Sequence, residues 1–539
     1  MKKTILILGI IFLFIVSIIS PISFGNNIKL LDFKGELPIN TTQGNPPEEE
    51  WNRTFGDSTK EKYDAGKDVQ QTTDGGYIIA GTTKSQGDPC GDFWLIKTNE
   101  SGIEQWNKTY GGMAGDFARS VLQINDGGYV LLGETASYGA GDYDCWLVKT
   151  DNSGNELWNK TYGGSGRESS ESVHMTYDGG YLLVGWTRSF GNGNSDFWLV
   201  KTDANGIEEW NKTYGGLDSE QAWDGQVTSD GGIVIAGFNY TKLPYDCNIL
   251  LIKTDMYGNE EWSKKYGNVN FLTAAYSVQQ TKDNGFIISG QGCYNGSYDL
   301  LLLKTDMYGE EQWNKTFEGE ACFDSAGYSV QQTPDGGFIA TGTTEIIGDF
   351  YCSALLVKTD INGNLQWYKT FNRTLHCRGW KVRQTNDKGY IIVGEIDFYG
   401  DVGGDVWLIK IAKENLPPNQ PIITGPTNGK VGEEYCWNIS SVEPDGDDLM
   451  YMVNWGDGYT TETECYPSGM EVEICHTYTA QGTYTIKVKA KECPDGLVGP
   501  EETFTITITK KSKAINMPFL NLLQIHPNMF LIIRHLLGL

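Results

Sequence analysis

A sequence word of about 52 residues recurs along the chain, and this repeat constrains the fold more than any other feature. Each copy contains a tryptophan, a short turn that begins with aspartate and has glycine at its third position, and a lysine within an apolar run. The tryptophans are Trp51, Trp106, Trp158, Trp210, Trp262, Trp313 and Trp367. The turns begin at Asp74, Asp126, Asp178, Asp230, Asp283, Asp335 and Asp387. The lysines are Lys97, Lys149, Lys201, Lys253, Lys304, Lys358 and Lys410. Such a period is typical of small units that bury their apolar faces against their neighbours.

Each copy contains the pattern of four short strands. In the second copy these are residues 118–124, 129–134, 145–150 and 156–162. The glycine turn joins the first two, because glycine adopts positive φ without a steric cost. Four strands in each of seven units predict an all-β chain with a seven-bladed β-propeller over residues 51–411. Residues 51–55 match a fourth strand and the chain leaves after a third, so we expect the segment 51–55 to complete the last blade.

The turn before the tryptophan carries a family resemblance. Thr150-Asp-Asn-Ser-Gly-Asn-Glu-Leu-Trp158 resembles the motif of quinoprotein-type (PQQ-like) propeller repeats. The unit as a whole resembles the secreted propeller repeats of archaeal and bacterial surface proteins. The resemblance implies architecture without activity, since a quinone-site pattern such as adjacent cysteines is absent from the sequence. We therefore expect no cofactor.

A second domain follows a proline-rich linker at residues 412–421. The words Val453-Asn-Trp-Gly-Asp-Gly458 and His476-Thr-Tyr478, together with the alternating segment 482–490, look like the PKD family. The resemblance covers residues 422–510 and implies an immunoglobulin-like β-sandwich that acts as a spacer or adhesion module. Asp445, Asp447 and Asp457 are weak candidates for a Ca²⁺ site, although Asp-Gly words are also ordinary turn formers.

Both ends of the chain are apolar. Residues 1–25 have two lysines, an apolar run and then small residues, which predicts a secretory signal peptide, with an uncleaved anchor as the alternative. Residues 26–50 then form a linker. The tail at 511–539 is apolar but interrupted by polar residues, so it could attach the protein to a membrane or cell envelope, or form a helix that docks on the protein's own surface. The export signal predicts an extracellular or cell-surface location.

Charge and cysteine content agree with export. A net charge of −27 disfavours nucleic acid and anionic lipid as main partners, because their phosphates would be repelled. Eleven cysteines suit an oxidising compartment. We expect two disulfides between neighbouring loops of the repeat region, Cys293–Cys322 and Cys352–Cys377. The four cysteines of the second domain, Cys436, Cys465, Cys475 and Cys493, allow three pairings.

Several glycosylation sequons directly follow the repeated tryptophan. They predict modified asparagines on an accessible outer strand, at Asn52, Asn107, Asn159, Asn211 and Asn314. The alternative is that the sequon was copied along with the repeat.

A binding site should break the repeat, because a position shared by every copy serves the unit itself. We therefore expect a structural role for the repeated lysines and for Asp92, Asp144, Asp196, Asp299 and Asp405, which stand five residues before the lysine in five copies. The position two residues before the first-strand valine does vary, and it is occupied by Lys67, Arg119, Glu171, Gly225, Tyr276, Tyr328 and Trp380. Charged residues on one side and aromatic residues on the other could bind a sugar or peptide at a channel mouth. The alternative is a plug of side chains that fills the channel.

Motifs of hydrolases, zinc proteases and phosphate-binding loops are absent from the sequence. We expect an exported, non-enzymatic binding, scaffold or adhesion protein whose partner is a surface glycan or protein. The alternative is an extracellular polysaccharide hydrolase or lyase with its site at the channel mouth.

Overall fold

The computed structural model describes residues 46–57, 62–242, 245–267, 272–294, 297–317, 325–346, 351–372, 376–397, 404–493, 496–511 and 535. The expected signal peptide, most of the following linker and nearly all of the tail lie outside these residues. The chain divides into two compact units. One comprises mainly residues 51–384 and 391–409, and the other mainly residues 410–539. Within the described residues, no helix has the length and apolar character needed to cross a membrane.

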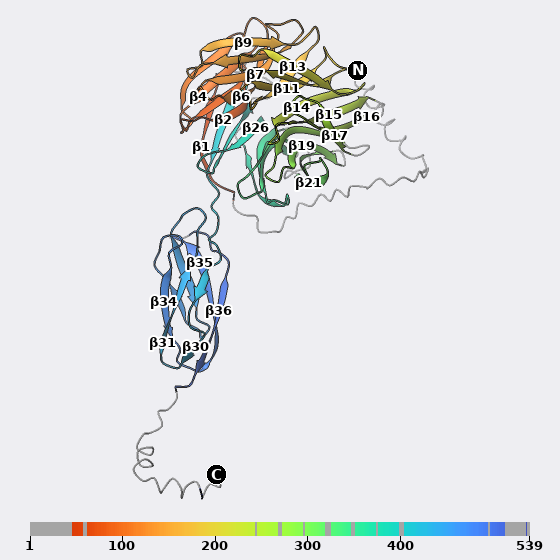
Figure 1. Ribbon diagram of the computed structural model, residues 1–539. Coiled ribbons are helices and arrows are strands. Elements are labelled where there is room, and N and C mark those ends of the chain that lie inside the picture. The colour runs from red at the N-terminus through yellow and green to blue at the C-terminus, as the bar shows by residue number, and fades with distance from the viewer. Residues whose placement is uncertain are drawn as a thin grey trace, which may run out of the picture. The chain divides into compact units, whose positions relative to one another are not determined.

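The first compact unit contains the copies of the repeat and is called the repeat unit below. Most of its strands are antiparallel and pair in chain order (Figure 1). The first two four-stranded sheets comprise β2 (Asp64–Gln71), β3 (Tyr77–Thr83), β4 (Asp92–Thr98) and β5 (Glu104–Tyr110), then β6 (Asp116–Gln123), β7 (Tyr129–Thr135), β8 (Asp144–Thr150) and β9 (Glu156–Tyr162). The third and fourth comprise β10 (Glu168–Met175), β11 (Tyr181–Thr187), β12 (Asp196–Thr202) and β13 (Glu208–Tyr214), then β14 (Ser219–Val227), β15 (Ile233–Lys242), β16 (Tyr245–Thr254) and β17 (Glu260–Tyr266). The fifth comprises β18 (Thr273–Gln280), β19 (Phe286–Tyr294), β20 (Ser297–Thr305) and β21 (Glu311–Phe317).

The remaining strands of this unit form one larger mixed sheet. Its members are β22 (Ala326–Gln332), β23 (Phe338–Ile346), β24 (Tyr351–Thr359), β25 (Leu365–Phe371), β26 (His376–Gln384), β27 (Tyr390–Asp397), β28 (Gly404–Ile411) and β1 (Glu49–Phe55). β24 and β26 pair in parallel through Cys352 and His376, which joins two copies of the repeat, and β1 pairs with β28.

The prediction of a seven-bladed β-propeller is therefore wrong. The chain is all-β, but its described strands form small antiparallel sheets and one eight-stranded mixed sheet, and none of these sheets closes on itself. The error comes from treating every copy as a separate four-stranded sheet. The sequence carries no signal for the parallel bridge between β24 and β26, which joins the last two copies.

Apolar side chains fill the space between consecutive sheets. One layer joins β3 and β4 to β6–β8 and includes Phe93 and Trp146, and the next joins β7 and β8 to β10–β12. Another layer joins the first sheet to β27 and β28 through Ile79, Val393 and Val406. Second and third strands such as β7, β11 and β12 are buried along their whole length, which fits their mainly apolar sequences.

Three repeated contacts explain the repeated residues. In six copies the repeated tryptophan covers the turn glycine of the next sheet: Trp158 lies against Gly206, whose φ is +72°. Tyr162 donates a hydrogen bond of 2.6 Å to the carbonyl of the same glycine. The repeated lysine bonds the turn aspartate of its own sheet, as Lys201 does with Asp178 at 2.9 Å. The expected structural role of the lysines thus agrees with these ion pairs, in which a buried lysine side chain reaches an exposed turn aspartate.

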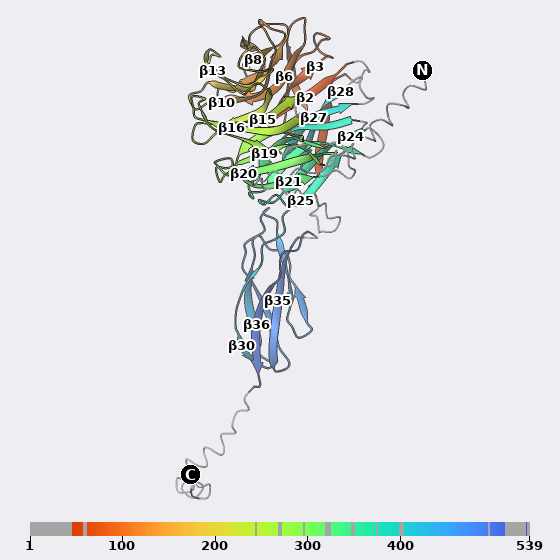
Figure 2. The same cartoon turned by 90° about the vertical axis from the view of Figure 1, so that its right-hand side faces the viewer.

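The second unit contains two packed sheets (Figure 2). One comprises β29 (Ile422–Thr424), β31 (Glu434–Ser440) and β34 (Val472–Thr477). The other comprises β30 (Asn428–Lys430), β36 (Glu502–Thr509), β35 (Gly482–Glu492), β32 (Leu449–Asn454) and β33 (Thr460–Glu462). Trp437 and Trp455 lie at the centre of one core, with ring centroids 5.2 Å apart. This arrangement is a β-sandwich.

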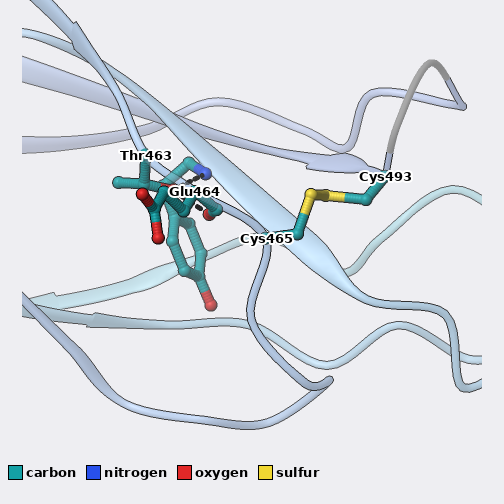
Figure 3. Close-up of a disulfide and its surroundings, with 5 residues drawn as sticks. Thr463, Glu464, Cys465 and Cys493 are labelled. Atoms are coloured by element: carbon teal, nitrogen blue, oxygen red, sulfur yellow. Dashed lines mark hydrogen bonds between the residues drawn. A yellow bond between two sulfur atoms is a disulfide. The ribbon is translucent and has the colours of Figure 1, made fainter.

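Two disulfides cross-link the sandwich. Cys436 bonds Cys475 between paired strands, and Cys465 bonds Cys493 between loops (Figure 3). This resolves the three pairings that the sequence left open. Covalent links of this kind are typical of extracellular domains.

The disulfide expected between Cys352 and Cys377 is not formed. Cys352 is level with His376 on the neighbouring strand, and its Sγ lies 3.5 Å from His376 Nδ1. The register of the two strands therefore places His376, and not Cys377, opposite Cys352. Cys293 is not in a disulfide either, and its expected partner Cys322 lies outside the described residues.

Candidate functional site

The variable position of the repeat coincides with a bulge in the first strand of each sheet. In the first six sheet pairings, one residue falls out of register between first and second strands. The residues at these bulges are Lys67, Arg119, Glu171, Trp223, Tyr276 and Tyr328. A bulge turns a side chain away from the regular alternation of a strand, so it can direct one residue per copy toward a common point.

These residues line one cavity of about 80 Å³. Its wall includes the six bulge residues, Trp380 and the polar residues that follow the bulges, such as Asp68 and Asp224. The structure thus brings together the six candidates Lys67, Arg119, Glu171, Tyr276, Tyr328 and Trp380. In the fourth copy Trp223 lines the cavity, and the predicted Gly225 does not. The position two residues before Val227 is Gly225, which is not the equivalent of Lys67. Asp224 is the equivalent of Asp68, and an alignment on these two aspartates identifies Trp223.

One side of the cavity is a continuous aromatic arc. Ring centroids are 5.1 Å apart from Trp223 to Tyr276, 5.4 Å from Tyr276 to Tyr328 and 4.4 Å from Tyr328 to Trp380. Burial raises the pKa of Tyr328 to about 12, so its hydroxyl remains protonated at neutral pH. The indole nitrogen of Trp223 is buried and has no hydrogen-bond partner, which leaves a donor on the lining.

The other side is charged and internally paired. Arg119 donates to Glu134 at 2.9 Å, and its Nε lies 3.8 Å from Glu171. Burial raises the pKa of the Glu171 carboxyl, and Arg119 opposes that effect. Glu134 also binds Arg167 at 3.1 Å.

Lys67 joins the two sides. Its Nζ lies 3.3 Å from the centre of the Trp380 ring and 3.6 Å from Glu395. Burial lowers the pKa of Lys67 to about 8, although Glu395 favours the charged form. Glu395 is held in turn by Arg378 at 2.9 Å and by the Tyr63 hydroxyl at 2.5 Å.

The buried carboxylates of this side are not among the residues predicted from the sequence. Glu134 and Glu395 each follow the glycine of a second strand, where other copies hold residues such as Thr82 and Phe238. An acidic residue at a position that is neutral in other copies breaks the repeat, and this difference could have identified Glu134 and Glu395 as candidates.

The other candidates lie elsewhere. Four of the five sequon asparagines share one contact, a bond from Nδ2 to the glutamate three residues earlier: Asn107, Asn159, Asn211 and Asn314. The first three also accept a bond from a tryptophan indole of the preceding strand. Asn52 is on β1. Their glycosylation stays a prediction.

The weak calcium candidates are not brought together. Asp445 and Asp447 precede β32, whereas Asp457 follows it and bonds His476 at 2.8 Å. The two groups therefore lie at opposite ends of one strand.

Comparison with known proteins gives limited matches. No family model matches the chain. The regulatory protein FlaEY of Caulobacter vibrioides is 25% identical over 200 residues, which cover 34% of this chain and 20% of that protein. The propeller and PQQ-like resemblance is not confirmed by these comparisons.

Among solved structures, immunoglobulin-type β domains match. The PKD domain of an M14-like peptidase from Thermoplasmatales archaeon SCGC AB-540-F20 is 40% identical, with a TM-score of 0.18, and covers 18% of this chain and all of that one. The PKD domain of human SorCS2 is 19% identical, with a TM-score of 0.15, over 18% of this chain and 79% of its own. The CARDB domain of PF1109 from Pyrococcus furiosus is 16% identical, with a TM-score of 0.13, over 18% of this chain and 93% of its own.

Proposed function

We propose that the protein is an exported, surface-associated binding or scaffold protein that recognises an oligosaccharide at the first-strand cavity. The supporting observation is the lining, where an aromatic arc faces buried acid–base pairs. Aromatic faces bind the apolar side of sugar rings, and polar groups with spare capacity bind hydroxyls. The two disulfides suggest an extracellular protein, in which such a ligand is accessible.

The size of the cavity limits how the ligand binds. A volume of about 80 Å³ is well below the several hundred Å³ of a pocket that encloses a small molecule. The cavity therefore accepts the edge of one sugar residue, and the rest of the chain lies outside it. A peptide that inserts one side chain is the competing ligand, consistent with a protein partner. The sandwich acts as a spacer, and the tail at 511–539 attaches the protein to the envelope.

Binding of the purified full chain to a glycan panel and to a peptide library distinguishes an oligosaccharide ligand from a peptide ligand. We expect glycan binding without turnover, and a loss of at least tenfold in affinity in Trp380→Ala. Trp380→Phe keeps a ring over Lys67 and should retain part of the affinity. Binding to peptides alone, or equal affinity in Trp380→Ala, would contradict the glycan proposal.

The enzymatic alternative has one supporting observation, the buried Glu171 carboxyl beside Arg119. A carboxyl with a raised pKa can act as a general acid. Turnover of a polysaccharide that disappears in Glu171→Gln and Arg119→Ala, with binding retained, would replace the binding function by a hydrolase or lyase.

A further inference from the structure

Buried carboxyl groups face one another at four junctions between neighbouring sheets. One comes from the start of a third strand and the other from the start of a first strand in the adjoining sheet. The pairs are Asp92 with Asp116, Asp144 with Glu168, Asp196 with Glu220, and Asp405 with Asp64. All eight residues are at least nine-tenths buried.

A glycine marks the point where the two oxygens of each pair converge. A Cβ atom added to Gly163 would lie 2.0 Å from Asp144 Oδ1 and 2.4 Å from Glu168 Oε2. At Gly111 the corresponding distances to Asp92 and Asp116 oxygens are 2.1 and 2.8 Å. Both carboxylates are therefore directed at the same small space beside the backbone.

In three of the four pairs the remaining contacts leave an oxygen unused. Asp144 Oδ2 accepts two backbone N–H groups, at 2.6 and 3.0 Å. Glu168 accepts the Thr187 hydroxyl at 2.7 Å and the Gly164 N–H at 3.0 Å. Asp144 Oδ1, however, is buried and has no hydrogen-bond partner, and the same holds for Asp92 Oδ1 and Asp64 Oδ2. The expected role as hydrogen-bond acceptor thus explains only one oxygen of Asp144.

Each pair needs a cation or a proton between its two carboxyl groups. Burial raises the pKa of Asp144, and the neighbouring Glu168 raises it further, while its backbone hydrogen bonds oppose the shift. Burial and Glu220 likewise raise the pKa of Asp196 to about 6. Two facing carboxylates out of contact with water are costly unless a cation or a proton lies between them.

We propose that these four junctions are divalent cation sites, and that the ion is Ca²⁺. The chemistry is that of hard oxygen ligands, because two carboxylates converge and neither thiol nor imidazole takes part. Ca²⁺ also accepts irregular geometry, and water or backbone carbonyl groups can complete its coordination. Each ion would bridge two neighbouring sheets, so calcium binding would stabilise the repeat unit whatever ligand the cavity takes.

The junction between β16 and β18 provides an internal comparison. Asn248 and Thr273 occupy the equivalent places there, and Gly267 stands over them as Gly163 stands over the acidic pair. Thr273 donates a hydrogen bond of 3.0 Å to the Tyr266 carbonyl. A neutral pair of this kind needs no cation, which makes Asn248 a matched control position.

Calcium binding to the full chain tests the proposal. After removal of divalent ions at pH 7.5, titration with Ca²⁺ followed by metal analysis should give about four ions per chain, one for each carboxyl pair. Saturating Ca²⁺ should raise the melting temperature of the repeat unit, and EGTA should reverse this. Asp144→Asn should remove one ion and reduce the rise, whereas Asn248→Ala should leave the stoichiometry unchanged. Asp196→Asn serves the same purpose if Asp144→Asn does not fold.

Two outcomes would overturn the proposal. One is the absence of bound calcium at millimolar Ca²⁺. The other is a melting temperature that ignores Ca²⁺ but rises as the pH falls from 7 to 5. The second result would mean that each pair holds a proton instead, because a carboxyl whose folded pKa is raised stabilises the fold below that pKa and loses the effect above it. Neither result bears on glycan binding, so this proposal and the proposed function can fail separately.

Discussion

The repeat unit and the sandwich hold their β-sheets together by different means. In the repeat unit most sheets offer the next one the same contacts: a tryptophan over a glycine and an apolar layer, joined at four junctions by a tyrosine hydroxyl on the glycine carbonyl. The sandwich has a single core around Trp437 and Trp455, and the two disulfides among the described residues both lie in it.

The difference follows from size. A small domain buries a smaller fraction of its surface on folding, so its core alone leaves little stability, and cross-links compensate. The stability of a repeat array is the sum of contributions from its many junctions, so the loss of one contact removes only a small part of it. The two units should therefore respond to different substitutions.

The largest expected effect is loss of the disulfide Cys465–Cys493. The two cysteines are 28 residues apart in sequence, so the disulfide restricts the unfolded chain. Replacing both by serine removes this restriction and should lower the free energy of unfolding of the sandwich by about 3–4 kcal/mol. Calorimetry of the full chain should show the transition of the sandwich shifted downward and that of the repeat unit unchanged. Cys90→Ser is the control, since Cys90 is an exposed thiol of the repeat unit. A shift of both transitions would mean that the units do not unfold separately.

A smaller effect is expected from Trp158→Ala in the repeat unit. The ring covers Gly206 and packs against Tyr181 at 6.3 Å, but it is only partly buried, so we expect a loss of about 2–3 kcal/mol. Urea unfolding monitored by far-UV circular dichroism measures it. Trp158→Phe should recover part of the loss, because the benzene ring retains part of the contact with the glycine. A loss below 0.5 kcal/mol, far under that of a filled core site, would show that this contact is dispensable.

The strands were predictable because the repeat supplies several copies of each signal. The segments expected at residues 129–134 and 156–162 match β7 and β9 within one residue, and the alternating segment 482–490 lies within β35. Local turn chemistry and apolar runs determine these elements. The joining of the last copies was not predictable, because the β24–β26 bridge depends on long-range packing.

The residues of the candidate site could be predicted in the copies that align on the first-strand valine, and the prediction failed in the copy that lacks it. Lys67, Arg119 and Glu171 precede a polar residue and then a valine, so counting back from the valine found them. In the fourth copy Gly225 stands in place of that valine. The next valine is Val227, so the same rule selected Gly225 instead of Trp223. The facing carboxyl pairs were also out of reach, because Asp144 meets Glu168 only when two sheets pack.

The smallest expected effect comes from Tyr162→Phe, which removes one hydroxyl and leaves the ring in place. The hydroxyl donates to the Gly206 carbonyl, and the loss of a buried hydrogen bond of this kind typically costs about 1 kcal/mol. Tyr110→Phe and Tyr214→Phe remove the equivalent bonds at the two adjoining junctions, so each should cost a similar amount. Urea unfolding of the three single variants and the triple variant measures the additivity. Additive losses are expected, because sites on separate junctions share no partner. A triple loss far above the sum would instead show that neighbouring junctions are coupled and that the repeat unit is stabilised as one cooperative body.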